Sequence, residues 1–257
     1  MSNKVQTLER MIAILDCFSL EEPILGVRAA ARKSGLSSST TGRLMANMKD
    51  HGILAQDDES LEYMIGARIL GWAGIYSATS DLRTLALPVM VHLQEKTRET
   101  ISLYTLEGNE RICIERLESP ETVRIVARVG RRIPLYAGSA GKVFLAFLPV
   151  SRTDEILNET DLVPMTRFTI TNLDKLKANL EEIRQHGYAV SKGEWISEAS
   201  GVAAPIFEQS GIITAALTIS GPAQRFTKEK IIEIASLVKN GAEKISHEMG
   251  YYMDRFD

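Results

Sequence analysis

One stretch near the start of the chain carries positive charge and no negative charge. Between Gly26 and Lys49 there is no aspartate or glutamate. The cations in this window are Arg28, Arg32, Lys33, Arg43 and Lys49. Lysine and arginine side chains neutralise the phosphates of nucleic acids, so a local basic stretch in a chain of net charge −3 indicates a DNA-binding surface.

Hydroxyl side chains follow in the same window, where Ser37 to Thr41 form an unbroken run of serine and threonine. Such residues cap the first turn of a helix. Ala31 and Gly35 suit the helix crossing and the tight turn of a helix-turn-helix motif. The second helix of that motif enters the major groove with its N-terminal end, where short polar side chains reach phosphates or base edges. The residues expected to contact DNA are Arg28, Ser37, Ser38, Ser39, Thr40, Thr41, Arg43, Asn47 and Lys49.

The same pattern has a plainer interpretation. Serine and threonine runs often only cap helices, and basic residues often lie on solvated helix faces. A solvated helical hairpin with a chance cluster of cations therefore stays open as the alternative.

A second candidate site lies at the expected start of a later helix. Gly138-Ser139-Ala140-Gly141 precedes the apolar segment 143–148, and free backbone N–H groups at a helix start bind anions such as carboxylates. The stretch is not a P-loop, because Tyr136 and Val143 replace the glycine and the serine or threonine of that motif. The alternative is a simple turn that packs a helix on a sheet.

No arrangement of residues indicates catalysis or metal binding. The four histidines are scattered without metal-ligand spacing, and Cys17 and Cys113 cannot supply a disulfide framework. The residue two before Ser139 is not glycine, so the nucleophile-elbow motif is absent. The carboxylates show no pairing typical of general acid–base catalysis. We therefore expect no enzyme activity, no cofactor and no metal site.

Short helices and strands are needed to position the basic window. Apolar side chains recur at three- and four-residue spacing from Val5 to Phe18, which predicts an amphipathic helix. Further helices are expected over about 26–33 and from Ser37 to the glycine at position 52. Two short strands, 53–55 and 61–64, then predict a hairpin that forms a wing beside the helices.

The rest of the chain mixes helices and strands. A helix over 67–80 has a surface of small residues, and we interpret it as a linker helix that also dimerises; an ordinary core helix is the alternative. Helices are expected over 85–96, 143–148, 173–187 and 228–249, and strands over 101–106, 111–117, 122–129, 202–208 and 212–220. Hairpin-linked strands between helices predict an antiparallel sheet covered by helices, which is an α+β fold.

Composition excludes several classes of protein. The 257 residues suggest about two domains at roughly 100–200 residues each. A hydrophobic content of 44% and a charged content of 25% are typical of soluble globular proteins and exclude wholesale disorder. No apolar run approaches the ~18 residues that span a bilayer, and the polar start lacks the core of a signal peptide. We therefore expect a cytoplasmic protein without a membrane partner.

Several ordered segments resemble one known family. They include 5–10, the hydroxyl-rich motif 35–44, segment 63–66, the glycine-rich stretch 132–142, and the later segments 187–190, 202–206 and 219–222. In this order they are similar to the IclR family of bacterial transcription regulators over nearly the whole chain. The motif 35–44 resembles the recognition helix of that family, and 132–142 resembles its most recognisable stretch.

The resemblance implies a division of the chain and a set of effector residues. A winged helix-turn-helix domain is expected over 1–66, a linker helix over 67–80 and an effector-binding domain with a GAF/PAS-like sheet over 81–257. Members of the family bind operator DNA as dimers or tetramers. Glu194 matches a family glutamate that can accept hydrogen bonds from a ligand, with an exposed loop carboxylate as the alternative, and relatives often carry cysteine at Gly201. The full set expected at the effector pocket is Ile125, Ile133, Ser139, Ala140, Gly141, Glu194, Gly201, Thr218 and Ser220.

The leading hypothesis is a ligand-responsive transcriptional regulator, most simply a repressor of a catabolic operon. It would bind operator DNA as a homodimer or homotetramer and sense a small organic acid or a related metabolite. Two alternatives stay open: a metabolic enzyme whose N-terminal helices are an interaction module, and a ligand-binding adaptor that does not contact DNA.

Overall fold

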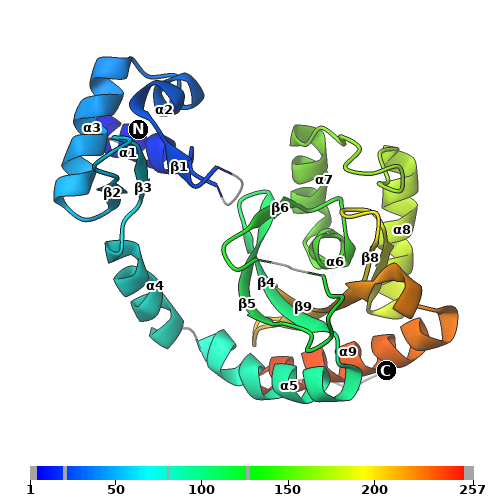
Figure 1. Cartoon of the computed structure of the whole chain (residues 1–257). Helices are drawn as coiled ribbons and strands as arrows, with labels where there is room; N and C mark the ends of the chain where they lie inside the picture. Colours follow the sequence, from blue (N-terminus) through cyan, green and yellow to red (C-terminus); the bar gives the residue numbers. More distant parts are fainter. Residues whose placement is uncertain (1–4, 20–21, 80, 126–127, 252–257) are drawn as a thin grey trace. The chain divides into compact units, whose positions relative to one another are not determined.

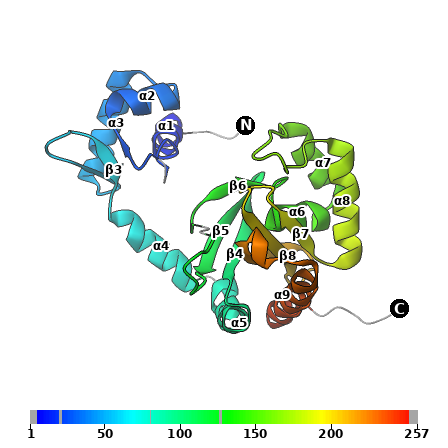
Figure 2. The same cartoon turned by 45° about the vertical axis from the view of Figure 1, so that its right-hand side comes forward.

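The structure is a computed structural model of the chain and describes residues 5–19, 22–79, 81–125 and 128–251. The chain divides into two compact units, residues 1–80 and 81–257 (Figures 1 and 2). The first unit has one hydrophobic core and the second has two.

The first unit is a winged helix-turn-helix domain followed by a further helix. Its elements are α1 (Gln6–Leu15), β1 (Ile24–Leu25), α2 (Val27–Ser34), α3 (Ser38–Asp50), β2 (Leu54–Gln56), β3 (Tyr63–Ile65) and α4 (Arg68–Thr79). The strands pair antiparallel in the order β1-β3-β2. Ile14, Met45, Met48 and Leu54 are buried where α1, α3 and the wing meet. The expected helices and hairpin are confirmed, and β1 is an addition that the sequence did not indicate.

The second unit is built on a curved antiparallel sheet. Its elements are α5 (Asp81–Thr97), β4 (Thr100–Glu107), β5 (Glu110–Leu117), β6 (Arg132–Pro134), α6 (Ser139–Phe147), α7 (Val150–Glu159), α8 (Leu173–His186), β7 (Ala189–Lys192), β8 (Ala199–Phe207), β9 (Ile213–Pro222), the 3-10 helix η1 (Ala223–Arg225) and α9 (Lys228–Glu248). In the described residues the sheet has six strands in the order β6-β5-β4-β9-β8-β7, every pair antiparallel. The expected α+β fold is confirmed.

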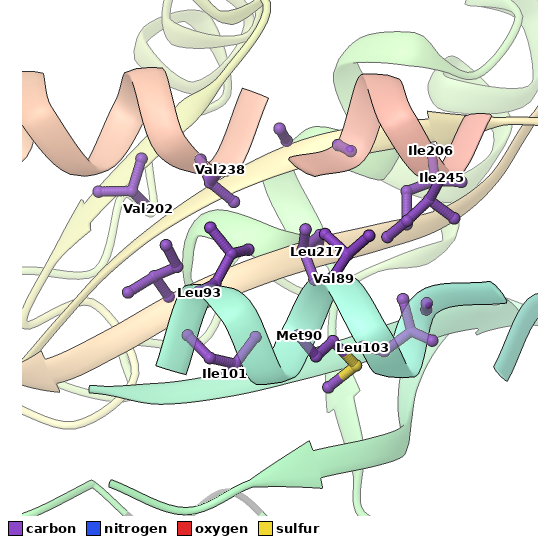
Figure 3. Packing of buried hydrophobic residues seen from close by; sticks show 14 of the residues in the cluster. Val89, Met90, Leu93, Ile101, Leu103, Val202, Ile206, Leu217, Val238 and Ile245 are labelled. Atoms are coloured by element: carbon purple, nitrogen blue, oxygen red, sulfur yellow. The ribbon is translucent and has the colours of Figure 1, made fainter. Parts of the chain in front are cut away.

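The sheet is covered on both faces, so successive residues of its strands enter different cores. On β9, Ala215, Leu217 and Ile219 pack against α5 and α9, and Figure 3 shows this core from close by. Ala216, one position along from Leu217, belongs to the other core, which includes the side chains of α6 and α8. This alternation is the period of two that a strand imposes. It decides which side chains of β9 face the α6 side of the sheet.

One expected strand is wrong. Residues 122–125 and 128–129 are not in a strand, although the segment 122–129 alternates like one. The free edge of β5 is instead taken by β6, where Arg111 pairs with Ile133. A turn at Gly130, with φ of 82°, brings the chain back to that edge. Helix α7 and strand β7 were not expected from the sequence. Among the described residues, no helix is long and apolar enough to cross a membrane.

We predict that Leu217→Ala destabilises the second unit by about 2–5 kcal/mol, because the truncation leaves a cavity in a close-packed core. Leu217 is fully buried between the sheet and two helices. The control is Ile232→Ala on α9, where the side chain is 70% exposed and little change is expected. Urea unfolding followed by circular dichroism measures both variants. Equal stability of the two variants would contradict the assignment of this core.

Candidate DNA-binding surface and effector cavity

The turn between α2 and α3 has the geometry of a helix-turn-helix motif. Helix α2 ends at Gly35, which adopts the left-handed conformation with φ of 69°, a region that glycine enters without steric cost. Ser37 then caps α3, because its Oγ accepts a hydrogen bond from the backbone N–H of Thr40 at 3.3 Å. The chain therefore leaves one helix and starts the next within four residues.

The hydroxyl groups at the start of α3 form a small network. Ser37 Oγ lies 3.2 Å from Ser39 Oγ and donates to Thr40 Oγ1 at 2.9 Å. Ser37, Ser38 and Ser39 are exposed and Thr40 is partly exposed. Their hydroxyl groups are thus available at the N-terminal end of α3, the end with free backbone N–H groups and a partial positive charge.

The expectation that Thr41 contacts DNA is wrong. The Thr41 side chain is fully buried, and its Oγ1 donates to the Ser37 carbonyl at 3.0 Å. Thr41 is followed at helical spacing by the buried residues Leu44, Met45 and Met48. This i, i+3, i+4, i+7 pattern marks the inner face of α3, so the sequence held the signal that places Thr41 in the core.

The other expected DNA-contacting residues are exposed but differ in their partners. Arg28, Arg43 and Asn47 are exposed, and Asn47 Nδ2 donates to the Arg43 carbonyl at 2.9 Å. Lys49 is exposed as well, and its Nζ donates to Gln56 Oε1 at 2.9 Å, which ties β2 of the wing to α3. Arg43 therefore offers a guanidinium on the exposed side of α3, one helical turn beyond the hydroxyl groups.

A cavity of about 80 Å³ (the volume open to the centres of water molecules) lies on the α6 side of the sheet in the second unit. Its walls come from strands β4 to β9, the start of α6, the segment between β5 and β6, and the loop after β7. The lining residues are Tyr104, Arg111, Ile125, Arg131, Ile133, Gly138, Ser139, Ala140, Ser191, Trp195, Ile196, Ala199, Ser200, Gly201, Thr218 and Ser220. The mixture of apolar walls with a few convergent polar groups is typical of a small-molecule site.

Most of the expected effector residues meet at this cavity. They are Ile125, Ile133, Ser139, Ala140, Gly201, Thr218 and Ser220. Gly201 keeps the space open, because a Cβ there would lie 3.1 Å from Ser139 Oγ and 3.5 Å from Ser220 Cβ. Residues far apart in the chain are thus brought together at one cavity.

Two expected effector residues lie outside the cavity lining, Gly141 and Glu194. A Cβ at Gly141 would lie 2.2 Å from the Leu135 carbonyl oxygen, so this glycine permits close packing behind the wall. The carboxylate of Glu194 is buried and already occupied. Its Oε1 lies 2.6 Å from Lys142 Nζ, and its Oε2 accepts from the Gly138 N–H at 3.0 Å.

The Lys142–Glu194 ion pair therefore has a positioning role. The side chain of Lys142 is 1% exposed and that of Glu194 is 8% exposed. Lys142 Nζ also donates to Asn179 Oδ1 on α8 and to the Val190 carbonyl on β7. Buried charges are tolerated when they are paired and hydrogen-bonded in this way. The pair holds α6, α8, β7 and the loop that carries Trp195 in one arrangement around the cavity.

The sequence did not indicate Tyr104 and Arg111 as cavity residues. Both are buried, and the Arg111 Cζ lies 5.5 Å from the centre of the Tyr104 ring. Burial raises the pKa of Tyr104 to about 12, so its hydroxyl stays protonated. Arg111 shares a face of β5 with buried Cys113, while the neighbouring Ile112 faces the other way. The alternation along β5 held part of this signal.

The chain is similar to known proteins along most of its length. Residues 7–58 match the family model described as the IclR helix-turn-helix domain, and residues 75–247 match the bacterial transcriptional regulator IclR C-terminal model. The chain is 32% identical to the HTH-type transcriptional regulator KipR of Bacillus subtilis over 98% of this chain and 100% of that protein. It is 31% identical to the HTH-type transcriptional repressor AllR of Klebsiella pneumoniae over 95% of this chain and 90% of that protein.

A solved structure is similar to the chain along its length. It is an IclR homolog from Microbacterium hydrocarbonoxydans complexed with 4-hydroxybenzoate. The TM-score is 0.81 at 29% identity, and the match covers 95% of this chain and 98% of that one. The two chains therefore share both the helix-turn-helix domain and the second unit, in the same order along the sequence.

We predict that Lys142→Met destabilises the second unit by about 3–5 kcal/mol, because it leaves the buried Glu194 carboxylate without its counter-charge. The double variant Lys142→Met, Glu194→Gln is expected to recover part of the loss, since the unpaired charge is then gone. Urea unfolding measures both. Lys177→Met, which removes a pair with Asp154 between half-exposed side chains, is the control and is expected to change stability by less than about 1 kcal/mol. A loss no larger than that of the control would contradict the role of the buried pair.

Proposed function

The chain belongs to the IclR family of bacterial transcriptional regulators, and from this premise we propose that α3 binds operator DNA under the control of a small organic acid held in the cavity of the second unit. The observation that carries the first half is the combination of Arg43 and the hydroxyl groups of Ser37 to Thr40 at the exposed N-terminal half of α3. Side chains at this end of a recognition helix reach base edges and phosphates.

The wing and the neighbouring cations add contacts to the DNA backbone. Arg28 on α2 and Lys49 in the last turn of α3 supply further positive charge, and no acid lies in the window between Gly26 and Lys49. Each phosphate contact releases a counterion, so binding falls steeply as salt is raised. Thr41 contributes through the core that orients α3 and makes no contact with DNA in this proposal.

We propose that the protein acts as a homodimer or homotetramer. Exposed apolar side chains at the start of α1 and on it (Val5, Leu8 and Ile12) and on α4 (Leu70 and Ile75) support self-association. A symmetric dimer presents two recognition helices about one or more DNA turns apart, ~34 Å each, and so reads a palindromic operator. In this proposal, residues 67–80 form the linker helix between a DNA-binding domain of residues 1–66 and an effector domain of residues 81–257.

An organic acid is the effector class that the cavity favours. Ser139, Thr218 and Ser220 supply hydroxyl groups, Ile125 and Ile133 supply apolar wall, and the cavity is small. The similar protein from Microbacterium hydrocarbonoxydans is a complex with 4-hydroxybenzoate, an aromatic carboxylate. The effector shifts the DNA-binding equilibrium only as far as it binds the two states of the protein unequally.

Repression of a catabolic operon in the cytoplasm, without enzymatic turnover, completes the proposal. The likeness to a transcriptional repressor along nearly the full length of both chains supports repression. Among the described residues no cluster of potential metal ligands is found, and no observation favours the enzyme alternative.

We predict that Arg43→Ala weakens binding to DNA from the region next to the protein's own gene by about tenfold or more, because a specific side-chain contact is worth about 1–3 kcal/mol. The fold is expected to stay intact, since Arg43 is exposed. A mobility-shift assay at several salt concentrations measures the affinity and its salt dependence. Lys230→Ala on α9 changes the net charge equally and is the control. Unchanged affinity of Arg43→Ala would reject the proposed interface.

We predict that Ser139→Phe abolishes the effector response and leaves DNA binding unchanged, because the ring fills the cavity. A library of small organic acids, 4-hydroxybenzoate included, is first screened for compounds that alter DNA binding by the unaltered protein. The compound found is then titrated against Ser139→Phe and against Ser210→Phe, a control in an exposed turn. A response of Ser139→Phe equal to that of the control would remove the cavity from the proposal.

A further inference from the structure

Arg111 is a charged side chain fixed in the cavity wall. It lies on β5, is only 4% exposed, and lines the cavity. Its Nη1 donates to the Pro134 carbonyl at 2.7 Å and to the Ala137 carbonyl at 2.8 Å. Gly138 and Gly141 make room for the guanidinium, because a Cβ at either position would lie within 3 Å of its nitrogens. The side chain is therefore held in one orientation next to the start of α6.

Arg111 makes no salt bridge within the described part of the chain. The Glu194 carboxylate attracts the Arg111 guanidinium electrostatically, but it forms its salt bridge with Lys142, at 2.6 Å, and none with Arg111. Burial lowers the pKa of Arg111 to about 10, because the charged form loses its water. The group still carries its charge at neutral pH. A buried charge without a partner is costly, so this arrangement indicates that an anion binds there.

The groups that remain free on this wall suit a carboxylate. Nη1 of Arg111 is used by two carbonyls, whereas Nε is buried without a hydrogen-bond partner among the described residues. Nη2 likewise makes no hydrogen bond there, which leaves the Nε–Nη2 edge of the guanidinium without a hydrogen-bond partner. On β9, Thr218 is 5% exposed and its Oγ1 also lacks a partner in the described structure. An arginine edge binds the two oxygens of a carboxylate through parallel hydrogen bonds.

The whole lining has the same sign of charge. It contains Arg111 and Arg131 and no acidic residue. Arg131 stacks over Trp195, with its Cζ 5.3 Å from the ring centre, so the second cation borders the aromatic part of the wall. A neutral or cationic ligand would leave this positive potential uncompensated, whereas an anion would offset it.

We propose that Arg111 is an effector-binding residue, and that the carboxylate of the effector binds its Nε–H and Nη2–H groups while the Thr218 hydroxyl donates a further hydrogen bond. This inference rests on the proposed function, in which the cavity receives an organic acid. In this inference, the main determinant of effector affinity is a side chain of β5, in place of the backbone N–H groups at and just before the start of α6. One of those N–H groups, that of Gly138, is already bound to Glu194 at 3.0 Å.

The test compares acids with their uncharged amides. The probes are acetate, lactate, benzoate and 4-hydroxybenzoate, each matched with its primary amide, and inorganic phosphate as a non-carboxylate anion. Thermal-shift titration gives the affinity for the unaltered protein, Arg111→Gln and Arg111→Lys. Arg116→Gln is the matched control, because Arg116 lies on the same strand, pairs with Glu118 and does not line the cavity.

The expected result is that at least one acid stabilises the unaltered protein and its amide does not. Arg111→Gln should bind that acid about 10–100-fold more weakly, the range for a hydrogen-bonded charge pair. Arg111→Lys keeps the charge without the planar edge, so its affinity should fall between the two. Arg116→Gln should bind the acid as the unaltered protein does. Because Arg111→Lys retains the charge, its intermediate affinity shows a role beyond folding.

Three results would overturn the inference. They are equal binding of acids and amides, binding of the acid by Arg111→Gln within about twofold of the unaltered protein, and stabilisation by phosphate alone or by no probe. A mobility shift with DNA from next to the gene is run in parallel on each protein. If the unaltered protein does not bind this DNA, the proposed function is contradicted. If it binds the DNA but does not distinguish acids from amides, only the role of Arg111 is contradicted.

Discussion

The second unit depends on one constraint: its antiparallel sheet is buried on both faces. Each strand must therefore supply side chains to two different interiors, and the period of two along the strand separates them. Leu217 and Ile219 enter the apolar core with α5 and α9. Thr218 and Ser220, the alternate residues of the same strand, line the cavity. A one-residue slip of β9 would exchange the two sets, so the same register holds the core together and places the hydroxyl groups of the site.

On the α6 side of the sheet, some buried charges are paired within the described part of the chain and one is not. Lys142 and Glu194 neutralise each other and add hydrogen bonds to Asn179 and to backbone groups, so their ion pair is complete within the chain. Arg111 is anchored by two carbonyls but has no carboxylate partner in the described residues. The Lys142–Glu194 pair stabilises the cavity wall, whereas the Arg111 guanidinium can still gain energy by binding an anionic ligand. The contrast separates the residues that build the cavity from the one that we propose selects what enters it.

In the first unit, most of the proposed DNA contacts lie on the single helix α3. The inner face of α3, with Thr41, Leu44, Met45 and Met48, fixes its position in the core. The outer face keeps Arg43 and Asn47 exposed. Ser37 serves both, since it caps the helix and its hydroxyl contacts those of Ser39 and Thr40. Neighbouring residues of α3 therefore fix its position in the core and expose the hydroxyl groups at its N-terminal end.

The sequence by itself determined what is local. Gly35 and Ser37 define a turn and a cap through their own backbone and side-chain preferences, and the acid-free window identifies the basic surface. The helical spacing of Thr41, Leu44, Met45 and Met48 also identifies the inner face of α3. Because Thr41 directly follows the hydroxyl residues Ser37–Thr40, the sequence pattern nevertheless assigns it to the DNA-binding surface. Tertiary structure alone decided the rest, because strand pairing and cavity formation depend on distant segments. Segment 122–129 alternates like a strand, yet β6 occupies the edge it would need. Arg111 and Thr218 are separated along the chain and meet only because β5, β4 and β9 are neighbours in the sheet, and no local pattern specifies which strand lies beside which.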